Sequence, residues 1–348
     1  MSGEPIRVAV VGLGGIADAH LRKLRWIADA QVVGVCDLSA SLTEAVADRF
    51  GVAGAYTDVD RMLAETRPHA VHVLTPPQSH PPLASAALAS GAHVLVEKPV
   101  AVTPDAYAGL RDAARAAGRH LVEDLNYRFQ RVTLQALEAV RSGAIGRPVT
   151  LEAAMSVGLA SGAYTDPDAP HFAHRLPGGA LFNFVSHPAS IVAAFLGAHD
   201  GVRVARRRLG AASLGDDELT ALVTAGGASA TITVTSHAQP SSFPVAIRGT
   251  EGALAFDVFT QRLRISHRSG RLGRIADDVA GGAAAIGQAL AGAGRAFGGR
   301  NDYVEGLGTL LDRFYDSLRT GGPPPLDPAE MDASNALVFA LVDEANAL

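Results

Sequence analysis

The chain has 348 residues, a length that allows two domains with separate hydrophobic cores. Its net charge of -5 argues against a general nucleic-acid-binding protein, so we expect no nucleic-acid partner. Cys36 is the only cysteine, which excludes an internal disulfide and every metal cluster held by several cysteines.

The sequence lacks the apolar patterns that direct a protein into or across a membrane. It has no apolar run of about eighteen residues, the length that a membrane helix needs. The first residues, Met1-Ser2-Gly3-Glu4-Pro5, lack the basic and apolar regions of a signal peptide. We therefore expect a soluble, cytoplasmic protein with no membrane partner.

The amino-terminal segment carries a glycine pattern typical of dinucleotide binding. A β-branched strand over 6–11 breaks at Gly12-Leu13-Gly14-Gly15-Ile16-Ala17, and a helical pattern follows through Trp26. In this setting Gly12 permits a tight turn, Gly14 lets the backbone approach a pyrophosphate, and Ala17 lets the helix pack closely on the strand. The free N–H groups at the start of the helix would stabilise the phosphate charge. The candidate cofactor-binding residues of this turn are Gly12, Gly14, Gly15 and Ile16.

A second strand, over 31–36, ends at an acidic residue, Asp37. Asp37 comes 23 residues after Gly14, close to the spacing expected for an acid that hydrogen-bonds the adenosine ribose hydroxyls. The next residues, Leu38-Ser39-Ala40, include no arginine that could bind a 2′-phosphate, and Asp37 would repel that phosphate. We therefore predict NAD as the cofactor in preference to NADP.

The alternation of strands and helices continues as far as residue 125. Further strands are predicted over 70–74, 93–97 and 120–124, and further helices over 59–65, 82–90 and 104–117. Strands that alternate with helices form a doubly wound, mostly parallel sheet. We therefore predict an α/β Rossmann domain over residues 1–125.

Lys98 is the strongest candidate for chemistry in this half of the chain. The chain has 30 basic residues but only two lysines, Lys23 and Lys98. A partly desolvated ammonium can share or lose a proton near neutral pH, whereas a guanidinium stays charged. Lys98 also follows a buried strand, and ligands bind at the carboxyl ends of the strands in open α/β sheets. The alternative is a lysine placed by chance at a surface turn. The residues predicted to line the same edge, beside a nicotinamide, are Thr75, Pro76, His80 and Glu97.

The second half of the chain changes to short strands with hairpin-like separators. Separators such as Ala225-Gly226-Gly227 fit a meandering antiparallel sheet. We predict an α+β substrate and oligomerisation domain over 126–328, and a helix over 329–348 that packs back on the Rossmann domain. The predicted strands are 149–157, 202–209, 219–224, 228–236, 243–249, 253–256 and 263–267.

Several of these segments together resemble the Gfo/Idh/MocA family, which includes glucose–fructose oxidoreductase and inositol dehydrogenase. The resemblance implies a nucleotide domain followed by a domain with a large, open, mostly antiparallel sheet that often forms dimers. It also implies reversible hydride transfer between a nicotinamide and a secondary alcohol of a sugar or cyclitol. We expect a homodimer or homotetramer formed through the carboxyl-terminal sheet. The motifs that carry the resemblance are the glycine turn, Thr75-Pro76-Pro77 with His80, Glu97-Lys98-Pro99, Asn126-Tyr127-Arg128-Phe129 and residues 178–187.

The resemblance also implies roles for residues of the second domain, with one departure. The family pattern has an aspartate four residues before the histidine of this segment, whereas this chain has Asn183 before His187. One helical turn would place both side chains on one face. Asparagine can orient a hydroxyl but cannot take a proton, so proton transfer would depend on His187, with Lys98 lowering the effective pKa of the alcohol. Asn126 and Arg128 would orient the substrate.

A polar loop over 164–175 leads into the segment that contains His187. We interpret this loop as a wall of the substrate site, with contacts from His171, His174 and Arg175. The alternative is an exposed loop with incidental polar residues. The two histidines are three residues apart, but no third ligand is spaced nearby, so we predict no metal site.

Three functions remain open at this stage. The leading hypothesis is an NAD-dependent dehydrogenase or reductase that acts on a sugar, a cyclitol or a sugar-like secondary alcohol. Some members of the resembled family keep NAD bound and cleave glycosidic bonds through transient oxidation, elimination and reduction. The fold of the family also serves as a dinucleotide-gated regulator without catalysis, a role that Asn183 suggests and that the retained Lys98 and His187 oppose.

Overall fold

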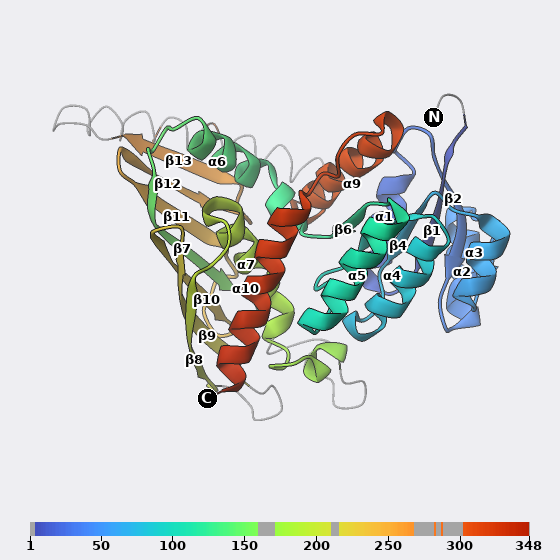
Figure 1. The fold of residues 1–348 in the computed structure, drawn as a ribbon, viewed down its shortest axis with the longest axis horizontal. Coiled ribbons are helices and arrows are strands. Elements are labelled where there is room, and N and C mark those ends of the chain that lie inside the picture. Colours follow the sequence, from blue (N-terminus) through green and yellow to red (C-terminus); the bar gives the residue numbers. More distant parts are fainter. Residues whose placement is uncertain are drawn as a thin grey trace. The chain divides into compact units, whose positions relative to one another are not determined.

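The computed structural model of the chain describes residues 4–158, 171–209, 216–267 and 302–347, together with Gly282 and Gly287. The chain divides into two compact units (Figure 1). Unit 1 comprises Met1–Leu125 and Leu307–Asp327, and unit 2 comprises Asn126–Gly306 and Pro328–Leu348. Each unit has its own sheet, as the length of the chain allows.

Unit 1 contains the predicted Rossmann sheet, with six parallel strands in the order β3-β2-β1-β4-β5-β6. The order reverses beside β1, because β2 pairs with one edge of β1 and β4 with the other. The carboxyl ends of β1 and β4 therefore border the crevice in which this fold binds its ligands. The strands are β1 (Ile6–Val11), β2 (Ala30–Cys36), β3 (Ala55–Tyr56), β4 (Ala70–Val73), β5 (His93–Val96) and β6 (Leu121–Glu123).

The helices of unit 1 begin where local sequence signals allow them to begin. The side chains of Ser39, Asp58 and Thr103 accept the first free N–H groups of α2, α3 and α5. Gly14, which precedes α1, has no side chain to do this, so the first N–H groups of α1 can face an anion. The elements are α1 (Gly15–Leu24), α2 (Ala40–Phe50), α3 (Val59–Thr66), η1 (Pro77–Ser79), α4 (His80–Ala89), α5 (Pro104–Ala117) and most of α9 (Asp302–Thr320).

Unit 2 contains a seven-stranded sheet in the order β13-β12-β11-β7-β10-β9-β8, which is mostly antiparallel. Among the neighbouring strands that the structure describes in this sheet, only β7 and β10 pair in parallel. Along β9 the buried residues Leu219, Ala221 and Val223 alternate with exposed ones, as expected of a sheet with one covered face. The strands are β7 (Pro148–Ser156), β8 (Gly201–Arg207), β9 (Glu218–Ala225), β10 (Ala228–Thr235), β11 (Pro244–Gly249), β12 (Gly252–Asp257) and β13 (Arg262–His267).

Helices cover one face of this sheet (Figure 1). They are α6 (Arg131–Arg141), α7 (Phe182–Leu196) and α10 (Pro328–Asn346), with the short turn η2 (Asn126–Phe129); the unit also contains the short turn η4 (Phe172–Arg175). The core between helices and sheet is built from aliphatic side chains such as Val185 of α7, Leu337 of α10 and Ile232 of β10. The predicted combination of a Rossmann sheet and a mostly antiparallel second sheet is confirmed.

The position of the last helix differs from the prediction. We expected residues 329–348 to pack on the Rossmann domain, but Leu337, Val338 and Leu341 of α10 lie in the core of unit 2. That prediction is wrong. The helix that completes unit 1 is α9, which buries Leu311 and Tyr315 there. The apolar positions of a helix show that one face is covered, but they do not show which sheet covers it.

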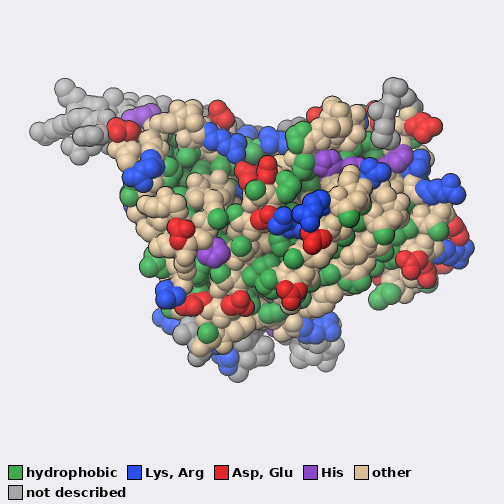
Figure 2. Space-filling model, in the orientation of Figure 1, with side chains coloured by type: hydrophobic (Ala, Val, Ile, Leu, Met, Phe, Trp, Pro, Cys, Tyr) green, Lys and Arg blue, Asp and Glu red, His purple; other side chains and the backbone are tan. Residues whose placement is uncertain are grey.

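The surface carries acidic and basic side chains intermixed. Figure 2 shows both signs of charge over the visible face, so its described residues form no extended basic surface. Among the helices that the structure describes, none has both the length and the hydropathy required to cross a membrane.

Candidate active site

The turn after β1 has the shape that a pyrophosphate requires. Gly12 has a φ of +88°, and a Cβ built on it would lie 2.7 Å from Cγ2 of Thr75 and 2.8 Å from the carbonyl carbon of Leu74. A side chain is therefore excluded at this position. In contrast, a Cβ built on Gly14 or Gly15 meets no atom within 4 Å, so the space in front of α1 is open. These residues fit a bound dinucleotide, with its phosphates at the start of α1.

Asp37 lies against the same turn. Its Oδ2 accepts a hydrogen bond from the backbone N–H of Leu13 at 2.9 Å, and its Oδ1 accepts one from the N–H of Ser39 at 3.1 Å. The carboxylate is half-buried at the end of β2, which is where an acid can reach the adenosine ribose. The geometry therefore agrees with the place that the sequence spacing predicts for this residue.

His80 joins two loops at the carboxyl edge of the sheet. Its Nδ1 lies 2.9 Å from the carbonyl oxygen of Pro99, and its Nε2 lies 2.7 Å from that of Thr75. The ring is buried, and burial lowers its pKa to about 4. A neutral ring can donate to only one of the two carbonyls at a time. His80 thus holds the loop after β4 against the turn that contains Lys98, and direct contact with a cofactor stays a prediction.

Lys98 follows β5 and is half-buried among acidic groups. Burial lowers the pKa of Lys98, whereas Glu97, Asp124 and Glu123 act in the opposite direction. Burial also raises the pKa of Glu97 to about 8; the charge of Asp124 adds to the rise and Lys98 opposes it. Glu123 and Asp124 are buried at the end of β6, where Glu123 accepts the backbone N–H of Val100 at 3.1 Å. The ammonium of Lys98 is therefore partly desolvated, and the neighbouring acidic groups stabilise its charge in place of the lost water.

Three possible metal ligands come together beside Lys98. One ligand atom each of His20, Glu97 and Asp124 lie within 4.8 Å of one another. His20 Nε2 and Asp124 Oδ2 are 3.2 Å apart, an ion-pair distance, and the Lys98 ammonium acts electrostatically on the same group. We therefore interpret this group as a buried polar cluster in which Lys98 supplies the positive charge. No local sequence pattern predicts this cluster, because His20 comes from α1 and Asp124 from the end of β6.

In unit 2, Asn183 and His187 lie one turn apart in the first half of α7. Both side chains are almost completely buried. The ring of Tyr127, from η2, packs on the imidazole of His187 with the centroids 4.3 Å apart. The helix begins after two glycines with positive φ, and a Cβ on Gly178 would lie 2.1 Å from Cδ2 of Phe182. A tight turn thus brings the chain into α7 and fixes where the helix begins.

Arg128, a predicted substrate contact, is held by α10. Its guanidinium is 5% exposed, and Nη2 lies 2.5 Å from Oε2 of Glu330. Arg141 also approaches Glu330, at 3.5 Å. Asn126 is buried, and Gly306 packs against its backbone carbonyl so closely that a Cβ on Gly306 would lie 2.2 Å from that oxygen. Contacts of Asn126 and Arg128 with substrate stay predictions.

Only part of the predicted substrate loop falls within the described residues. Residues 164–170 lie outside them, and η4 begins at Phe172. His171 precedes η4, its Nδ1 accepts the N–H of Ala173 at 3.3 Å, and its ring packs on Phe172. His174 is half-buried and Arg175 is exposed. These three residues therefore lie together around one short helical turn.

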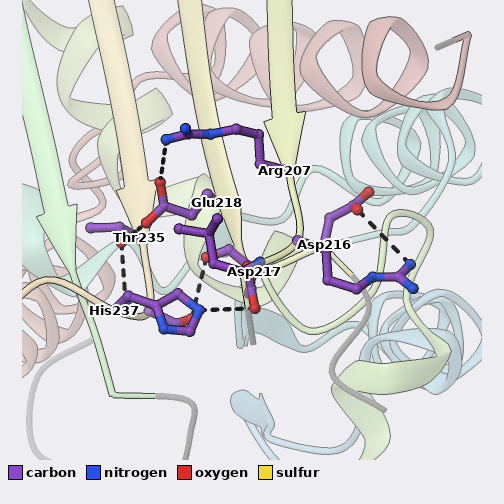
Figure 3. A network of polar contacts seen from close by, with 9 residues as sticks. Arg207, Asp216, Asp217, Glu218, Thr235 and His237 are labelled. Atoms are coloured by element: carbon purple, nitrogen blue, oxygen red, sulfur yellow. Dashed lines mark hydrogen bonds and ion pairs between the residues drawn. The ribbon is translucent and has the colours of Figure 1, made fainter. Parts of the chain in front are cut away.

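A second histidine–carboxylate pair lies at the open end of the β9–β10 hairpin, where β9 begins and β10 ends (Figure 3). Oδ2 of the fully buried Asp217 is 2.9 Å from Nε2 of His237, whose side chain is 31% exposed. Nearby, Thr235 donates to Glu218, and Arg207 pairs with Glu218 at 3.1 Å. This pair was not among the predicted site residues. The sequence signal that could have indicated this pair is the glycine turn near residue 226. Pairing of the two strands around that turn sets Thr235 opposite Glu218.

The two groups predicted to carry the chemistry belong to different units. Lys98 lies in unit 1 with the glycine turn, whereas His187 and Asn183 lie in unit 2. The structure brings Lys98 together with Glu97 and the acids of β6, and brings His187 together with Tyr127. The convergence of Lys98 and His187 on one substrate stays a prediction.

Two family models match the chain. One, described as "Oxidoreductase family, NAD-binding Rossmann fold", matches residues 6–124, and the other, "GFO/IDH/MocA C-terminal domain", matches residues 133–255. D-glucoside 3-dehydrogenase of Escherichia coli (strain K12) is 36% identical over 147 residues, which are 42% of this chain and 42% of that protein. Glycosyl hydrolase family 109 protein 2 of Akkermansia muciniphila is 34% identical over 158 residues, which are 43% of this chain and 33% of that protein. The matched segments thus span less than half the length of these curated relatives.

A solved structure shares the complete fold. The WlbA dehydrogenase from Bordetella pertussis, determined in complex with NADH and UDP-GlcNAcA, superposes with a TM-score of 0.80 and 21% sequence identity. The alignment covers 100% of this chain and 97% of that chain. The likeness therefore includes both sheets and the helices that pack on them.

Proposed function

The chain belongs to the Gfo/Idh/MocA oxidoreductase family, and on this premise we propose that it is an NAD-dependent dehydrogenase of sugar-like secondary alcohols. The substrate class is a sugar, a cyclitol or a sugar derivative, and the reaction runs between the alcohol and the ketone. The observation that carries the proposal is the position of Lys98. It is a partly desolvated ammonium at the carboxyl end of β5, on the sheet edge that also carries the glycine turn.

The cofactor would be held by the turn after β1. The open space at Gly14 and Gly15 accepts the pyrophosphate, and the first N–H groups of α1 stabilise its charge. Asp37 accepts hydrogen bonds from the ribose hydroxyls and repels a 2′-phosphate, which favours NAD over NADP. When bound, the nicotinamide supplies the hydride acceptor for alcohol oxidation and the hydride donor for ketone reduction.

The residues of the chain would handle the proton and the developing charge. During oxidation the substrate O–H proton passes to the imidazole of His187, while the carbon loses its hydrogen as a hydride. The ammonium of Lys98 hydrogen-bonds the substrate oxygen and stabilises the negative charge that develops on it. Tyr127 packs on the imidazole and limits the directions in which His187 can turn. Asn183, one turn earlier in α7, orients a substrate hydroxyl without taking a proton.

A second candidate is cleavage of a glycosidic bond by an enzyme that keeps NAD bound. The similarity to glycosyl hydrolase family 109 protein 2 of Akkermansia muciniphila favours it. In that reaction, oxidation of the hydroxyl two carbons from the one that bears the leaving group would acidify the C–H between them and permit elimination of the aglycone. Water would then add to the double bond, and the hydride would return to the ketone. Such an enzyme releases an aglycone and accumulates no NADH, which separates the two candidates in one assay.

We also propose a homodimer or homotetramer that forms through the outer face of the sheet in unit 2. Leu222 of β9 is 50% exposed there and pairs across the strands with the exposed Thr231 of β10. The proposal rests on the resemblance to a family that often forms dimers through this sheet, and Leu222 is an exposed side chain of that sheet whose replacement tests it. Light scattering after gel filtration tests this proposal: Leu222→Lys should lower the molar mass, and a monomeric wild-type protein would contradict it.

The experiment for the reaction follows NADH absorbance and products over a panel of sugars, cyclitols and glycosides. Lys98→Ala and His187→Ala should each reduce turnover by about a hundredfold or more. Turnover that survives both substitutions would contradict the proposed roles. Release of an aglycone without NADH would replace the first candidate with the second.

A further inference from the structure

One face of α7 is polar although it is buried. Four polar residues are spaced three or four positions apart along it and therefore share one side of the helix. They are Asn183, Ser186, His187 and Ser190, and each is at most 5% exposed. The residues of α7 that lie in the hydrophobic core of unit 2 occupy a different side of the helix and include Phe182, Val185, Ala189 and Val192. A buried polar face requires hydrogen-bond partners for its polar atoms.

Two other buried serines show how a helix can satisfy a serine hydroxyl by itself. Oγ of Ser190 donates to the carbonyl oxygen of His187 at 2.7 Å. Oγ of Ser317, in α9, donates to the carbonyl oxygen of Phe314 at 2.7 Å. In each case the acceptor lies three residues earlier in the same helix. A buried serine on a helix can therefore be satisfied without a partner from any other element.

The hydroxyl of Ser186 is not satisfied in this way. It is buried, and within the described part of the chain no donor or acceptor lies within hydrogen-bond reach of its Oγ. An unsatisfied buried hydroxyl destabilises a fold, whereas alanine at the same position would avoid that loss and favour the helix. The contacts among the described residues therefore give this hydroxyl no role in stabilising the fold.

A second unsatisfied polar atom belongs to a residue close to the same histidine. Oδ1 of Asn126 is buried and has no hydrogen-bond partner among the residues that the structure describes. Asn126 precedes Tyr127 in η2, and the ring of Tyr127 packs on His187 with the centroids 4.3 Å apart. Ser186 and Asn126 are thus each adjacent in sequence to one of two rings in contact. Near His187, a polar ligand would therefore find hydrogen-bond partners.

We propose that Ser186 is a further binding residue of the substrate site, and that its hydroxyl hydrogen-bonds a substrate hydroxyl on the carbon next to the reacting one. The proposal rests on the proposed function, in which His187 takes the proton of the reacting hydroxyl. Ser186 adjoins His187 on the same helix face, and sugars and cyclitols carry hydroxyls on neighbouring carbons. A serine hydroxyl can both donate and accept, so it fits a substrate hydroxyl in either direction. The substrate is therefore a vicinal diol and not an isolated secondary alcohol.

The kinetic test compares substrates with and without the neighbouring hydroxyl. The probe is the sugar or cyclitol of the panel that the wild-type protein oxidises with the highest kcat/KM, together with its deoxy analogues at the two carbons beside the reacting one. In the wild-type protein, kcat/KM for one of these analogues should be lower by about tenfold or more. In Ser186→Ala the full substrate should lose a similar factor, and removal of the same hydroxyl should then cost less than about twofold more.

Unfolding in urea shows whether the hydroxyl of Ser186 serves the fold instead. The midpoint for Ser186→Ala should equal or exceed that of the wild-type protein, because no hydrogen bond among the described residues is lost. The matched control is Ser317→Ala, which removes a buried hydroxyl that donates to Phe314. Its midpoint should fall, while its discrimination between the substrate and the analogue stays unchanged. A lower midpoint for Ser186→Ala together with unchanged discrimination would overturn the proposal.

The outcomes separate failure of this proposal from failure of the proposed function. If the wild-type protein turns over no member of the panel, the proposed function fails and the role of Ser186 fails with it. If His187→Ala abolishes turnover but Ser186→Ala discriminates against the analogue as strongly as the wild-type protein does, the function stands and the role of Ser186 is wrong. A wild-type protein that oxidises the full substrate and both analogues equally well would also contradict this role.

Discussion

Gly12 and Thr75 approach each other so closely that a Cβ on Gly12 would lie 2.7 Å from Cγ2 of Thr75. The contact joins the turn after β1 to the loop after β4, the two loops on either side of the point where the strand order reverses. Both loops must be in place before a dinucleotide can bind between them. The contact therefore links the stability of unit 1 to its affinity for the cofactor.

Gly12→Ala should lower the free energy of unfolding by about 2–4 kcal/mol, because the methyl group clashes and φ is +88°. NAD affinity, measured by calorimetry, should fall at least about tenfold. Gly14→Ala is the matched control: φ is -67° and a Cβ there meets open space, so stability should change by less than about 1 kcal/mol. Equal destabilisation by the two substitutions would contradict this account of the turn.

Asp37→Asn should reduce the preference for NAD over NADP by about tenfold or more, because the repulsion of the 2′-phosphate disappears. Asparagine can still accept the N–H of Leu13, so the turn should keep its shape. Binding of both cofactors is measured by calorimetry on the two proteins. Asp105→Asn, an exposed acid in the first turn of α5, should leave the preference unchanged. A wild-type protein that prefers NADP would show the assignment of Asp37 to be wrong.

Glu330→Gln should destabilise unit 2 by about 1–3 kcal/mol, because the buried guanidinium of Arg128 loses the charge of the Glu330 carboxylate. Arg141→Gln removes the other partner of the same glutamate, at 3.5 Å and with a side chain that is 62% exposed. That change should cost less than about 0.5 kcal/mol. Chemical denaturation of both variants gives the comparison. Similar losses of unfolding free energy in Glu330→Gln and Arg141→Gln would indicate that the buried Arg128–Glu330 pair stabilises the fold no more than a surface ion pair does.

His93→Asn should make the free energy of unfolding less dependent on pH below 6.5. Burial lowers the pKa of His93 from 6.5 to about 4 in the folded chain, so the folded state resists protonation that the unfolded state accepts. This stability is complete above pH 6.5 and is lost as the pH falls towards 4. Asparagine can still accept the N–H of His120, which Nδ1 of His93 accepts at 3.0 Å.

The measurement is the free energy of unfolding in urea at a series of pH values. At pH 8 the difference between the two proteins reports the lost ring contacts alone, such as the stacking on His120. Below pH 6.5 the wild-type curve should fall more steeply than that of His93→Asn. Parallel curves over the whole range would show that His93 has its ordinary pKa in the folded protein.

The turn that we propose as the cofactor site was predictable because its residues lie in one short segment. The turn from Gly12 to Ala17 lies between a strand and a helix, and Asp37 ends the next strand. These elements are close in sequence, and their spacing is what predicts a dinucleotide-binding turn. The hydrogen bond from Leu13 to Asp37 then places the acid against the turn. The strand candidates of the second half were also predictable, since β9 and its neighbours alternate buried and exposed residues.

The contacts between distant segments were not predictable in this way. His20 and His72 are 52 positions apart, and His72 and Tyr315 are 243 apart, so no local pattern relates them. In the sequence, a histidine on an apolar helix face gives the same pattern whether or not a second histidine lies within hydrogen-bond distance in the folded protein. The same holds for Asp217 and His237, which only the pairing of β9 with β10 brings together.

The sequence by itself determined the fold class, the two sheets and the dinucleotide turn, because these follow from side-chain periodicity and from steric rules that act over a few residues. The tertiary structure alone decided which helix completes which unit, that Arg128 pairs with Glu330, and that Lys98 lies near the buried Glu123 and Asp124. Local propensity acts within one element, whereas a buried polar group takes whatever partner the packing of separate elements brings within hydrogen-bond distance.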